Sequence, residues 1–327
     1  MSKDFSQQPG LHRVAALVDE GSNPFELACM TEVFGIDRPE VGGLLYDFRL
    51  CAHRREVPMR QNFFTMTGLA DLTLLDSADT VIVPNRPDTE TARHPAVLGA
   101  IARAHARGAR LVGMCSGAFT LAEAGVLTGR TVTLHWQWAA EFRRRFPDTE
   151  VDDAVLFIDD GDVLTSAGSA AALDLALHLV GRDHGTQIAT AVARRLVFAA
   201  HRRGGQRQFI ERPVPRDPGP SLAETVEWAE HHATEPITVA DIAAAGCVSV
   251  ATLHRRFRAE LGCTPLAWLT ARRLDYARRL LEASELSVEQ VATASGLGTA
   301  VNLRTHLAAA TGLTPTAYRR QFRTRPA

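Results

Sequence analysis

The sequence of 327 residues is almost free of lysine, because Lys3 is its one lysine and arginine supplies the rest of the 36 basic side chains. Acidic residues number 37, so the formal net charge is −1, which excludes a uniformly basic coat for nucleic acid. No run reaches 18 apolar residues, and this excludes a membrane-spanning helix. With 46% hydrophobic and 22% charged residues, the composition is that of a globular chain of about two domains.

Cysteine is also scarce. The five cysteines stand at positions 29, 51, 115, 247 and 263, and this odd, scattered set indicates neither a disulfide framework nor a CxxC metal pair. We therefore expect no metal, no cofactor and mostly buried thiols in a reducing compartment. No apolar run follows Lys3, so we expect no secretory signal and a cytoplasmic location.

Positive charge is concentrated toward the carboxyl terminus. Residues 1–216 carry 24 basic and 26 acidic side chains, whereas residues 236–327 carry 12 arginines and six acidic side chains. The window 246–281 holds seven arginines against Glu260 and Asp275. Because arginine makes bidentate contacts with phosphate and guanine, this distribution favours nucleic-acid binding by the second half of the chain.

A segment rich in proline and glycine divides the chain. Residues 202–220 hold four prolines and three glycines, a composition that supports neither a long helix nor a central strand. We expect a first domain over residues 11–201, a linker over residues 202–220 and a second domain over residues 221–327.

The first domain alternates short β-rich runs with helical stretches. Alternation of this kind favours a mainly parallel sheet with helices on both faces. Asp159-Asp160-Gly161-Asp162 is a hairpin-turn signal between two of the strands. Strands are expected over residues 13–18, 46–52, 80–83, 109–114, 151–158 and 163–166, and helices over residues 24–34, 94–107, 119–124, 170–180 and 187–201.

The motif Gly113-Met114-Cys115-Ser116-Gly117 follows an expected strand and precedes an expected helix. This is the G-x-nucleophile-x-G pattern of a nucleophile elbow, in which glycines let the chain turn tightly around the central residue. The N-terminus of the following helix would lower the pKa of Cys115 and favour the thiolate. Glu26 and His135 could approach the same edge of the sheet. The group is either a catalytic or sensing constellation, or a tight turn around a buried thiol.

On these residues, the first domain resembles the ThiJ/PfpI group of class I glutamine-amidotransferase-like domains. The resemblance implies a flavodoxin-like α/β fold with Cys115 at the elbow and Glu26 at the acidic position beside it. Peptidases of this group follow the elbow cysteine with histidine, whereas this chain has Ser116. His135 lies in a stretch that resembles the regulator branch of the group. The resemblance therefore implies a domain that senses a small molecule or dimerises, and no peptidase.

The second domain is helical throughout and contains two similar units. In the first, a short helix closes at Gly246, a turn follows, and Ser249 is a good N-cap for a helix over residues 250–261. Two helix-turn-helix units joined by one apolar-faced helix form a specific pattern. The connecting helix is expected over residues 265–283, the second unit over residues 287–311 and a closing helix over residues 315–322.

This all-α arrangement resembles the AraC/XylS-type DNA-binding domain, and the motifs Gly296-Leu297 and Pro315–Arg319 are close to the end signature of that family. The order of sensor and reader resembles GlxA-type regulators of the FtrA/AdpA-like branch. The resemblance implies a sequence-specific transcription factor that binds double-stranded promoter DNA. It also implies RNA polymerase and a small-molecule effector as partners, and a homodimer formed through the first domain.

Side chains off the core stripe of the two recognition helices are the expected DNA contacts. Residues 282–318 hold one arginine against three glutamates, so we expect the second unit to attract phosphate weakly. Sequence reading should then rest mainly on the first unit. The expected contacts are Thr252, His254, Arg255 and Arg258 in the first helix, and Asn302 and Arg304 in the second.

A thiol-dependent hydrolase or hydratase that uses Cys115 is the alternative function. An enzyme has no need of a basic, doubled helix-turn-helix region, so this region discriminates between the two hypotheses. We therefore expect a regulator without a catalytic residue, in which Cys115, Glu26 and His135 are vestigial or act in sensing.

Overall fold

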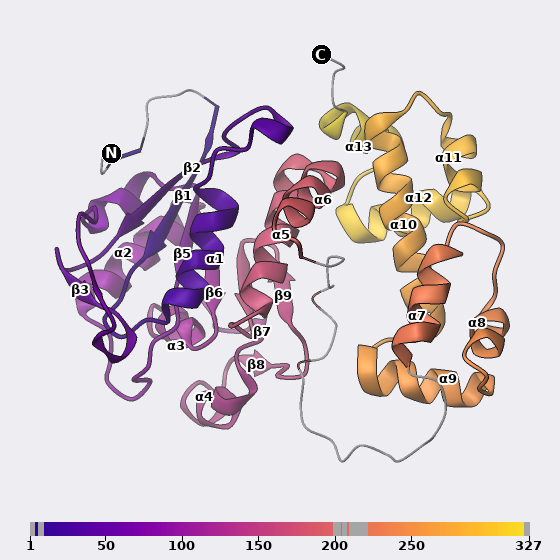
Figure 1. Cartoon of the computed structure of the whole chain (residues 1–327). Coiled ribbons are helices and arrows are strands. Elements are labelled where there is room, and N and C mark those ends of the chain that lie inside the picture. Colours follow the sequence, from indigo (N-terminus) through magenta and orange to yellow (C-terminus); the bar gives the residue numbers. More distant parts are fainter. Residues whose placement is uncertain (1–3, 6–9, 199–203, 205–207, 209–221, 324–327) are drawn as a thin grey trace. The chain divides into compact units, whose positions relative to one another are not determined.

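The computed structural model describes residues 4–5, 10–198, 204, 208 and 222–323, and the chain forms two compact units (Figure 1). Unit 1 comprises Met1–Leu179 and Ala191–Gln208, and unit 2 comprises Val180–Thr190 and Phe209–Ala327. The expected linker lies almost wholly outside the described residues, so the expected domain limits stay predictions. Within the described part of the chain, no helix is long and apolar enough to cross a membrane.

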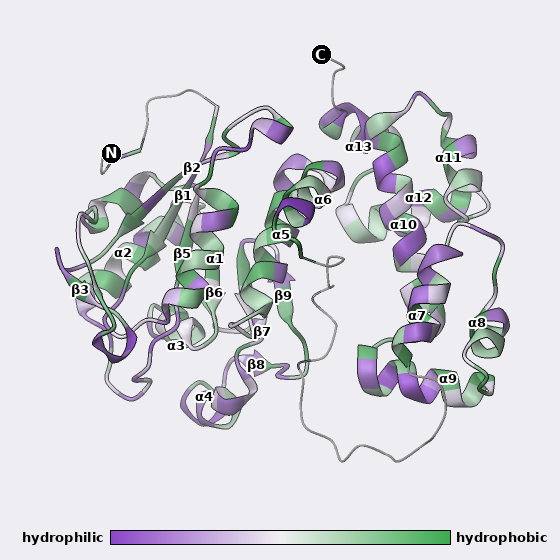
Figure 2. Ribbon diagram, in the orientation of Figure 1, coloured by the Kyte–Doolittle hydropathy of each residue, from purple (hydrophilic) through white to green (hydrophobic). Residues whose placement is uncertain are grey.

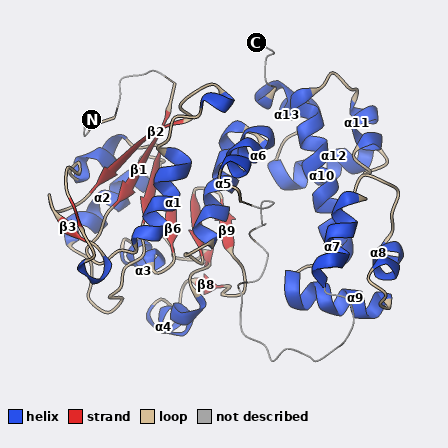
Figure 3. Cartoon of the chain, in the orientation of Figure 1, coloured by secondary structure: helices blue, strands red, loops and turns tan. Residues whose placement is uncertain are grey.

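Unit 1 is built on a six-stranded sheet, drawn red in Figure 3, with the order β2-β1-β5-β6-β10-β9. Neighbouring strands are parallel except for β9 and β10, which pair antiparallel across the turn at Gly161. Its strands are β1 (His12–Leu17), β2 (Tyr46–Cys51), β5 (Thr80–Val83), β6 (Arg110–Met114), β9 (Phe157–Asp160) and β10 (Val163–Ser166). The smaller sheets pair β3 (Val57–Pro58) with β4 (Thr65–Met66), and β7 (Thr131–Val132) with β8 (Glu150–Val151).

Helices cover both faces of the large sheet. Ala15 and Leu17 of β1 belong to one apolar cluster with side chains of α2 and α3, while their neighbours Val14 and Ala16 are fully buried as well. Because successive side chains of a strand point to opposite faces, burial of both sets means that neither face is open. The helices are α1 (Pro24–Phe34), α2 (Pro95–Ala106), α3 (Gly117–Glu123), α4 (Ala139–Arg145), α5 (Ala171–His184) and α6 (Thr186–Arg195). Short 3₁₀ turns occupy η1 (Pro39–Val41), η2 (Arg60–Asn62), η3 (Leu72–Ser77) and η4 (Trp136–Trp138).

The expected α/β fold class is confirmed, and so is the hairpin at residues 159–162. The single strand expected over residues 151–158 is wrong, because the chain forms β8 and β9 with a break between them. At this break the N–H of Ala154 donates to the Asp152 carboxylate at 3.0 Å, an Asx turn that interrupts the extended chain. The helix expected over residues 187–201 is shorter, since α6 ends at Arg195.

Unit 2 is all-helical, as expected. In Figure 2 its helices carry hydrophobic and hydrophilic residues on the same element, which is the pattern of helices with one buried face. One apolar cluster includes Ile242, Leu253 and Phe257, and a second includes Leu303 and Leu307. The helices are α7 (Leu222–His231), α8 (Val239–Ala245), α9 (Val250–Arg256), α10 (Pro265–Ala283), α11 (Val288–Ala294), α12 (Ala300–Thr311) and α13 (Pro315–Phe322).

A hydroxyl side chain begins every helix from α8 to α13. In each case the hydroxyl oxygen accepts a hydrogen bond from a backbone N–H in the first turn, which satisfies a donor that the helix cannot pair internally. Helices α8 and α11 add the reciprocal bond of a capping box. The caps are Thr238, Ser249, Thr264, Ser287, Thr299 and Thr314.

The turn between α5 and α6 belongs to unit 2 and is held there by Glu282 of α10. The Glu282 carboxylate is buried and accepts hydrogen bonds from the backbone N–H groups of Thr186 (2.9 Å) and Gln187 (2.7 Å). It also accepts a bond from the Tyr318 hydroxyl at 2.7 Å. A buried carboxylate thus caps the N-terminus of a helix distant in sequence, where helix dipole and free N–H groups favour negative charge.

Candidate functional site

Cys115 stands between β6 and α3 at the centre of the expected elbow. Its φ of 53° lies in the left-handed region, which side chains other than glycine rarely adopt. Gly117 allows the tight approach that follows, since a Cβ there would lie 2.5 Å from the Val83 carbonyl oxygen. Gly113 is similarly packed, since a Cβ there would lie 2.8 Å from a methyl of Leu121. The elbow geometry is therefore present.

Glu26 and Cys115 meet at one glycine, Gly168. A Cβ at position 168 would lie 2.2 Å from Cβ of Cys115 and 2.7 Å from Oε1 of Glu26. The Glu26 side chain, on α1, is buried, and its Oε1 accepts a hydrogen bond from the Ser169 N–H at 2.8 Å. Its Oε2 is buried and has no hydrogen-bond partner among the described residues. The fold thus brings together the cysteine and the acid that the sequence indicated.

The charge state expected for Cys115 is wrong. Burial, and then the neighbouring Glu26 carboxylate, raise the pKa of Cys115 to about 12, although hydrogen bonds from Ser116 and from the His135 backbone act in the other direction. Burial also raises the pKa of Glu26 above its ordinary value, against the lowering effect of the Ser169 and Asn85 backbone bonds. At neutral pH Cys115 is a protonated thiol, because the desolvation of this site outweighs the favourable N-terminus of α3.

His135 reaches Cys115 through its backbone. The ring instead accepts a hydrogen bond at Nδ1 from the N–H of Gln137 (3.3 Å), where it caps the η4 turn. Burial lowers the pKa of His135. The ring lies 5.4 Å, between centroids, from that of Trp136, which is exposed. The role of His135 as a base therefore stays a hypothesis that these contacts do not support.

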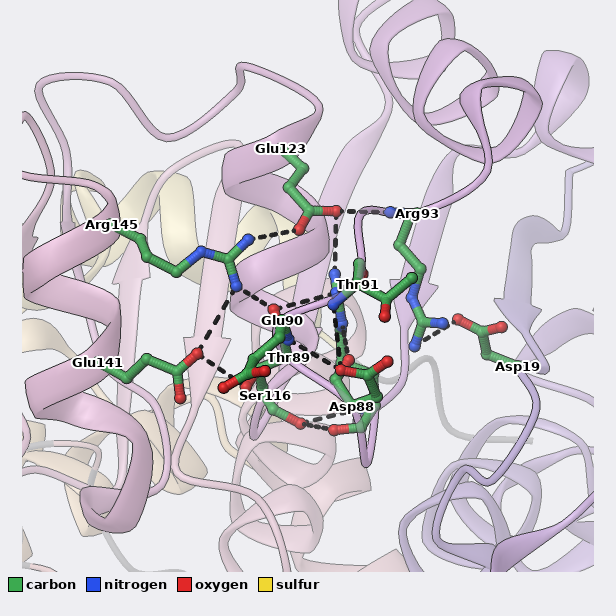
Figure 4. A network of polar contacts seen from close by, with 11 residues as sticks. Asp19, Asp88, Thr89, Glu90, Thr91, Arg93, Ser116, Glu123, Glu141 and Arg145 are labelled. Carbon is green, nitrogen blue, oxygen red and sulfur yellow. Dashed lines mark hydrogen bonds and ion pairs between the residues drawn. The ribbon is translucent and has the colours of Figure 1, made fainter.

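Ser116, next to Cys115, is bound to the loop that follows β5. Its hydroxyl donates to the backbone carbonyl of Arg86 (2.6 Å) and accepts from the backbone N–H of Arg86 (2.9 Å). The Arg86 guanidinium is itself buried and pairs with Glu123 at 2.9 Å. Figure 4 shows this polar network around Ser116 and Glu123. Ser116 thus fixes the elbow to its neighbouring loop.

The same network continues to α4 and to the loop that follows β1. Glu123 also pairs with Arg145 (3.1 Å) and accepts from the backbone N–H of Arg93 (3.0 Å). The Arg93 guanidinium pairs with Asp19, after β1, at 3.0 Å. Each arginine of this network pairs with an acidic side chain, so the network holds the loops around the elbow together. Among the described residues, no group of three metal-ligating side chains could hold a metal ion.

Sequence reasoning missed Gly168 and Ser169, which complete the site from the end of β10. Ser169 has a positive φ of 49°, and its N–H is the partner of Glu26. The available signal was the position of these residues, because ends of parallel strands share one edge of a sheet. Arg60 was also missed, and its charge lowers the pKa of Glu26.

The first recognition helix, α9, and the turn that follows it present two arginines to solvent. Arg255 and Arg258 are exposed, and within the described part of the chain neither has a hydrogen bond or an ion pair. His254 is half-exposed. The hydroxyl of Thr252 accepts a bond from Ser249 (3.0 Å) at the start of the helix, so it serves the cap. Beyond Arg256 the helix widens into a π-helical turn, Phe257–Leu261, where an unbroken α-helix was expected.

The second recognition helix, α12, presents its two expected contacts differently. Both Asn302 and Arg304 are exposed. The Asn302 side-chain amide donates to the Leu297 carbonyl at 3.2 Å, and Arg304 pairs with Glu289 of α11 at 3.5 Å. A DNA contact would require the Asn302 amide and the Arg304 guanidinium. In this structure both groups already have partners within the protein.

Several other arginines of the basic window are structural. Arg273 donates to the backbone carbonyls of Ala233 (2.7 Å) and Glu235 (2.6 Å). Arg278 donates to the Tyr318 hydroxyl at 2.9 Å, and Arg272 pairs with Glu230 at 3.6 Å. Much of the positive charge therefore holds the helices of unit 2 together rather than facing solvent.

Comparison with known families finds one match in each half of the chain. Residues 56–182 match the DJ-1/PfpI family, and residues 242–321 match a helix-turn-helix domain family. The solved structure of an AraC family transcriptional regulator from Pseudomonas putida covers 57% of this chain and 99% of its own, with a TM-score of 0.51 and 22% identity. At this identity the likeness shows the fold alone.

Curated relatives of this chain are named as transcriptional regulators. The HTH-type transcriptional regulator ArgR of Pseudomonas aeruginosa is 34% identical over 66% of this chain and 66% of its own. The regulator GlxA of Rhizobium meliloti is 32% identical over 58% of each chain. The matches thus span about three fifths of these relatives. The chain thus combines a DJ-1/PfpI match with a helix-turn-helix match, and its relatives are regulators of the GlxA/ArgR type.

Proposed function

We propose that the protein regulates transcription by binding double-stranded promoter DNA through unit 2 in response to a small molecule held by unit 1. The observation that carries this proposal is the pair Arg255 and Arg258, exposed on a recognition helix and without partners in the described residues. Several other arginines of the region are engaged within the unit, so these two stand out on the recognition helix as cations free to meet DNA.

In a helix-turn-helix protein the recognition helix enters the major groove with its first turns against the base edges. On α9, Arg255 follows the capped first turn and can make a bidentate contact with guanine. Arg258, in the π-helical turn that follows α9, can reach the phosphate backbone. The Ser249 cap fixes where the helix begins and therefore which side chains reach the groove.

We propose that the elbow of unit 1 binds an effector and performs no catalysis. A thiol with a pKa of about 12 is a weak nucleophile at pH 7, and the His135 ring that could activate it is engaged at its own turn. The unpartnered Oε2 of Glu26 supports binding, because a buried polar atom gains a hydrogen bond when a ligand supplies a donor.

Two further partners follow from this function. Few arginines are free to contact DNA, so one chain has little electrostatic affinity for DNA. A homodimer formed through unit 1 would raise that affinity because it joins two DNA-binding units. RNA polymerase is the partner that a promoter-bound regulator addresses. DNA binding also implies a cytoplasmic location.

The test is DNA binding by the full-length chain. A random-sequence duplex pool is selected for binding, and dissociation constants are measured for a selected and an unselected duplex. We expect the selected duplex to bind more tightly, and the double variant Arg255→Ala, Arg258→Ala to lose that preference. Arg144→Ala, at an exposed arginine of α4 in unit 1, is the matched control and should bind as wild type. Failure of the pool to yield any preferred duplex contradicts the proposal.

The elbow is tested separately with Cys115→Ser. We expect this variant to bind the selected duplex as wild type does, while its reporter output no longer responds to metabolite extract. Turnover of amide or ester substrates by the wild type that disappears in Cys115→Ser would instead establish the thiol hydrolase.

A further inference from the structure

Three polar side chains near the start of the second recognition helix have partners within the protein. The Asn302 amide donates to the Leu297 carbonyl (3.2 Å), and the Arg304 guanidinium lies 3.5 Å from the Glu289 carboxylate. The Thr305 hydroxyl donates to the carbonyl of Val301 at 3.0 Å, within the same helix. The Asn302, Arg304 and Thr305 donors in the first turns of α12 therefore each have a partner within the protein.

Methyl groups remain on the outer face of the same helix. Val301, in the first turn of the helix, is 67% exposed. Thr305 and Ala308 are also exposed, and they lie four and seven residues further along. This spacing places the three side chains on one face of α12, so the helix offers solvent a strip of methyl groups.

We propose that α12 recognises thymine by its 5-methyl group, with Val301 as the specificity-determining side chain. This rests on the proposed function, in which unit 2 binds duplex DNA. The first turn of a recognition helix faces base edges in the major groove, and the thymine methyl is the feature there that apolar side chains contact. A helix whose first-turn donors already have protein partners and whose methyl groups are exposed fits that feature.

Continuity with α9 argues for DNA as the occupant of this strip. Both helices belong to unit 2, and α10, which joins the two helix-turn-helix units, is 19 residues long, or about 28 Å at the usual helical rise. That length is close to one turn of duplex DNA, ~34 Å. Once Arg255 and Arg258 hold α9 on a duplex, α12 has a neighbouring stretch of groove within reach.

The test removes the methyl group from the DNA. Full-length protein is first used to select duplexes from a random pool, and each thymine of a selected duplex is then replaced in turn by deoxyuracil, which lacks only the 5-methyl. We expect at least one replacement to weaken binding about fourfold, the loss corresponding to one buried methyl at ~0.8 kcal/mol. Equal affinity for every replaced duplex overturns the proposal.

The variant Val301→Ala assigns the effect to its residue. We expect it to weaken binding to the thymine duplex and to reduce the thymine-to-deoxyuracil ratio at that position from about four to about one. Val197→Ala, at a valine 92% exposed in unit 1, should keep the full ratio. A ratio unchanged in Val301→Ala contradicts the proposal, and loss of reporter output with unchanged DNA affinity would assign the strip to a protein partner. Failure to bind any duplex would instead contradict the proposed function.

Discussion

The two helix-turn-helix units of unit 2 share a scaffold and differ in what they present. Each begins with a capping box, at Thr238 in one and Ser287 in the other, and each caps its recognition helix with a hydroxyl. On α9 the exposed side chains include free guanidinium groups, whereas on α12 the guanidinium of Arg304 faces Glu289. The comparison teaches that local structure and surface chemistry are specified by separate residues.

In both helix-turn-helix units the turn contains one residue in the left-handed conformation, but the residue type differs. After α8 the left-handed position is taken by Cys247 (φ 50°), and after α11 by Gly296 (φ 74°). A side chain costs strain in this conformation, so the first unit tolerates a cost that the second avoids. The first turn is also one residue shorter, since Ser249 follows Cys247 by two residues and Thr299 follows Gly296 by three.

The largest effect on stability is expected at this turn. Gly296→Ala adds left-handed strain and places a Cβ 2.8 Å from Nε of Arg273 and 2.9 Å from the Thr234 carbonyl oxygen. We expect a loss of about 2–4 kcal/mol in the free energy of unfolding, measured by urea denaturation. The control Cys247→Ala keeps the same backbone conformation and should cost less than about 1.5 kcal/mol. Equal losses would remove the distinction between the turns.

The next effect concerns the two exposed arginines. Arg255→Ala should weaken binding to a selected duplex about tenfold to one hundredfold, because a bidentate guanine contact contributes ~1–3 kcal/mol of discrimination. Arg304→Ala removes a guanidinium that already faces a carboxylate, so we expect a change below about threefold. Dissociation constants measured on the selected duplex decide the matter, and similar losses for both variants would show that the second unit reads bases through arginine.

The two hydroxyl caps should behave alike. Ser249→Ala and Thr299→Ala each remove an acceptor for a first-turn N–H, and each should lower the free energy of unfolding by about 1 kcal/mol. Thermal and urea unfolding of the two variants provide the comparison. A loss confined to one cap would mean that the scaffold is not shared in its energetics.

The smallest effect is expected from Glu289→Gln. This change releases Arg304 without touching the capping box, whose members are Ser287 and Gln290. One additional cation free to meet phosphate should steepen the slope of log K against log salt by about 0.9. A salt titration on an unselected duplex measures the slope, and an unchanged slope would show that α12 does not approach the backbone.

The elbow and the two helix-turn-helix units were predictable because their sequence signals are local. Glycines two residues on either side of Cys115 and hydroxyl caps before Val250 and Ala300 act within a few residues of sequence. The raised pKa of Cys115 was not predictable, since it arises from burial beside Glu26, which folding brings from 89 positions away. The Arg304–Glu289 pair was hidden for the same reason, because it joins two helices across a turn.

The Glu282 carboxylate limits how a DNA-binding unit of this kind can be exchanged between proteins. A fusion that starts at the proline-rich segment would contain Glu282 but not Thr186 and Gln187. The Glu282 carboxylate would then lose the hydrogen bonds that it accepts from the N–H groups of these two residues. A buried carboxylate without hydrogen-bond partners costs free energy, so the transplanted DNA-binding unit would be less stable than the original. Recombination that succeeds must bring the α5–α6 turn along, and the heritable module is therefore discontinuous in the gene.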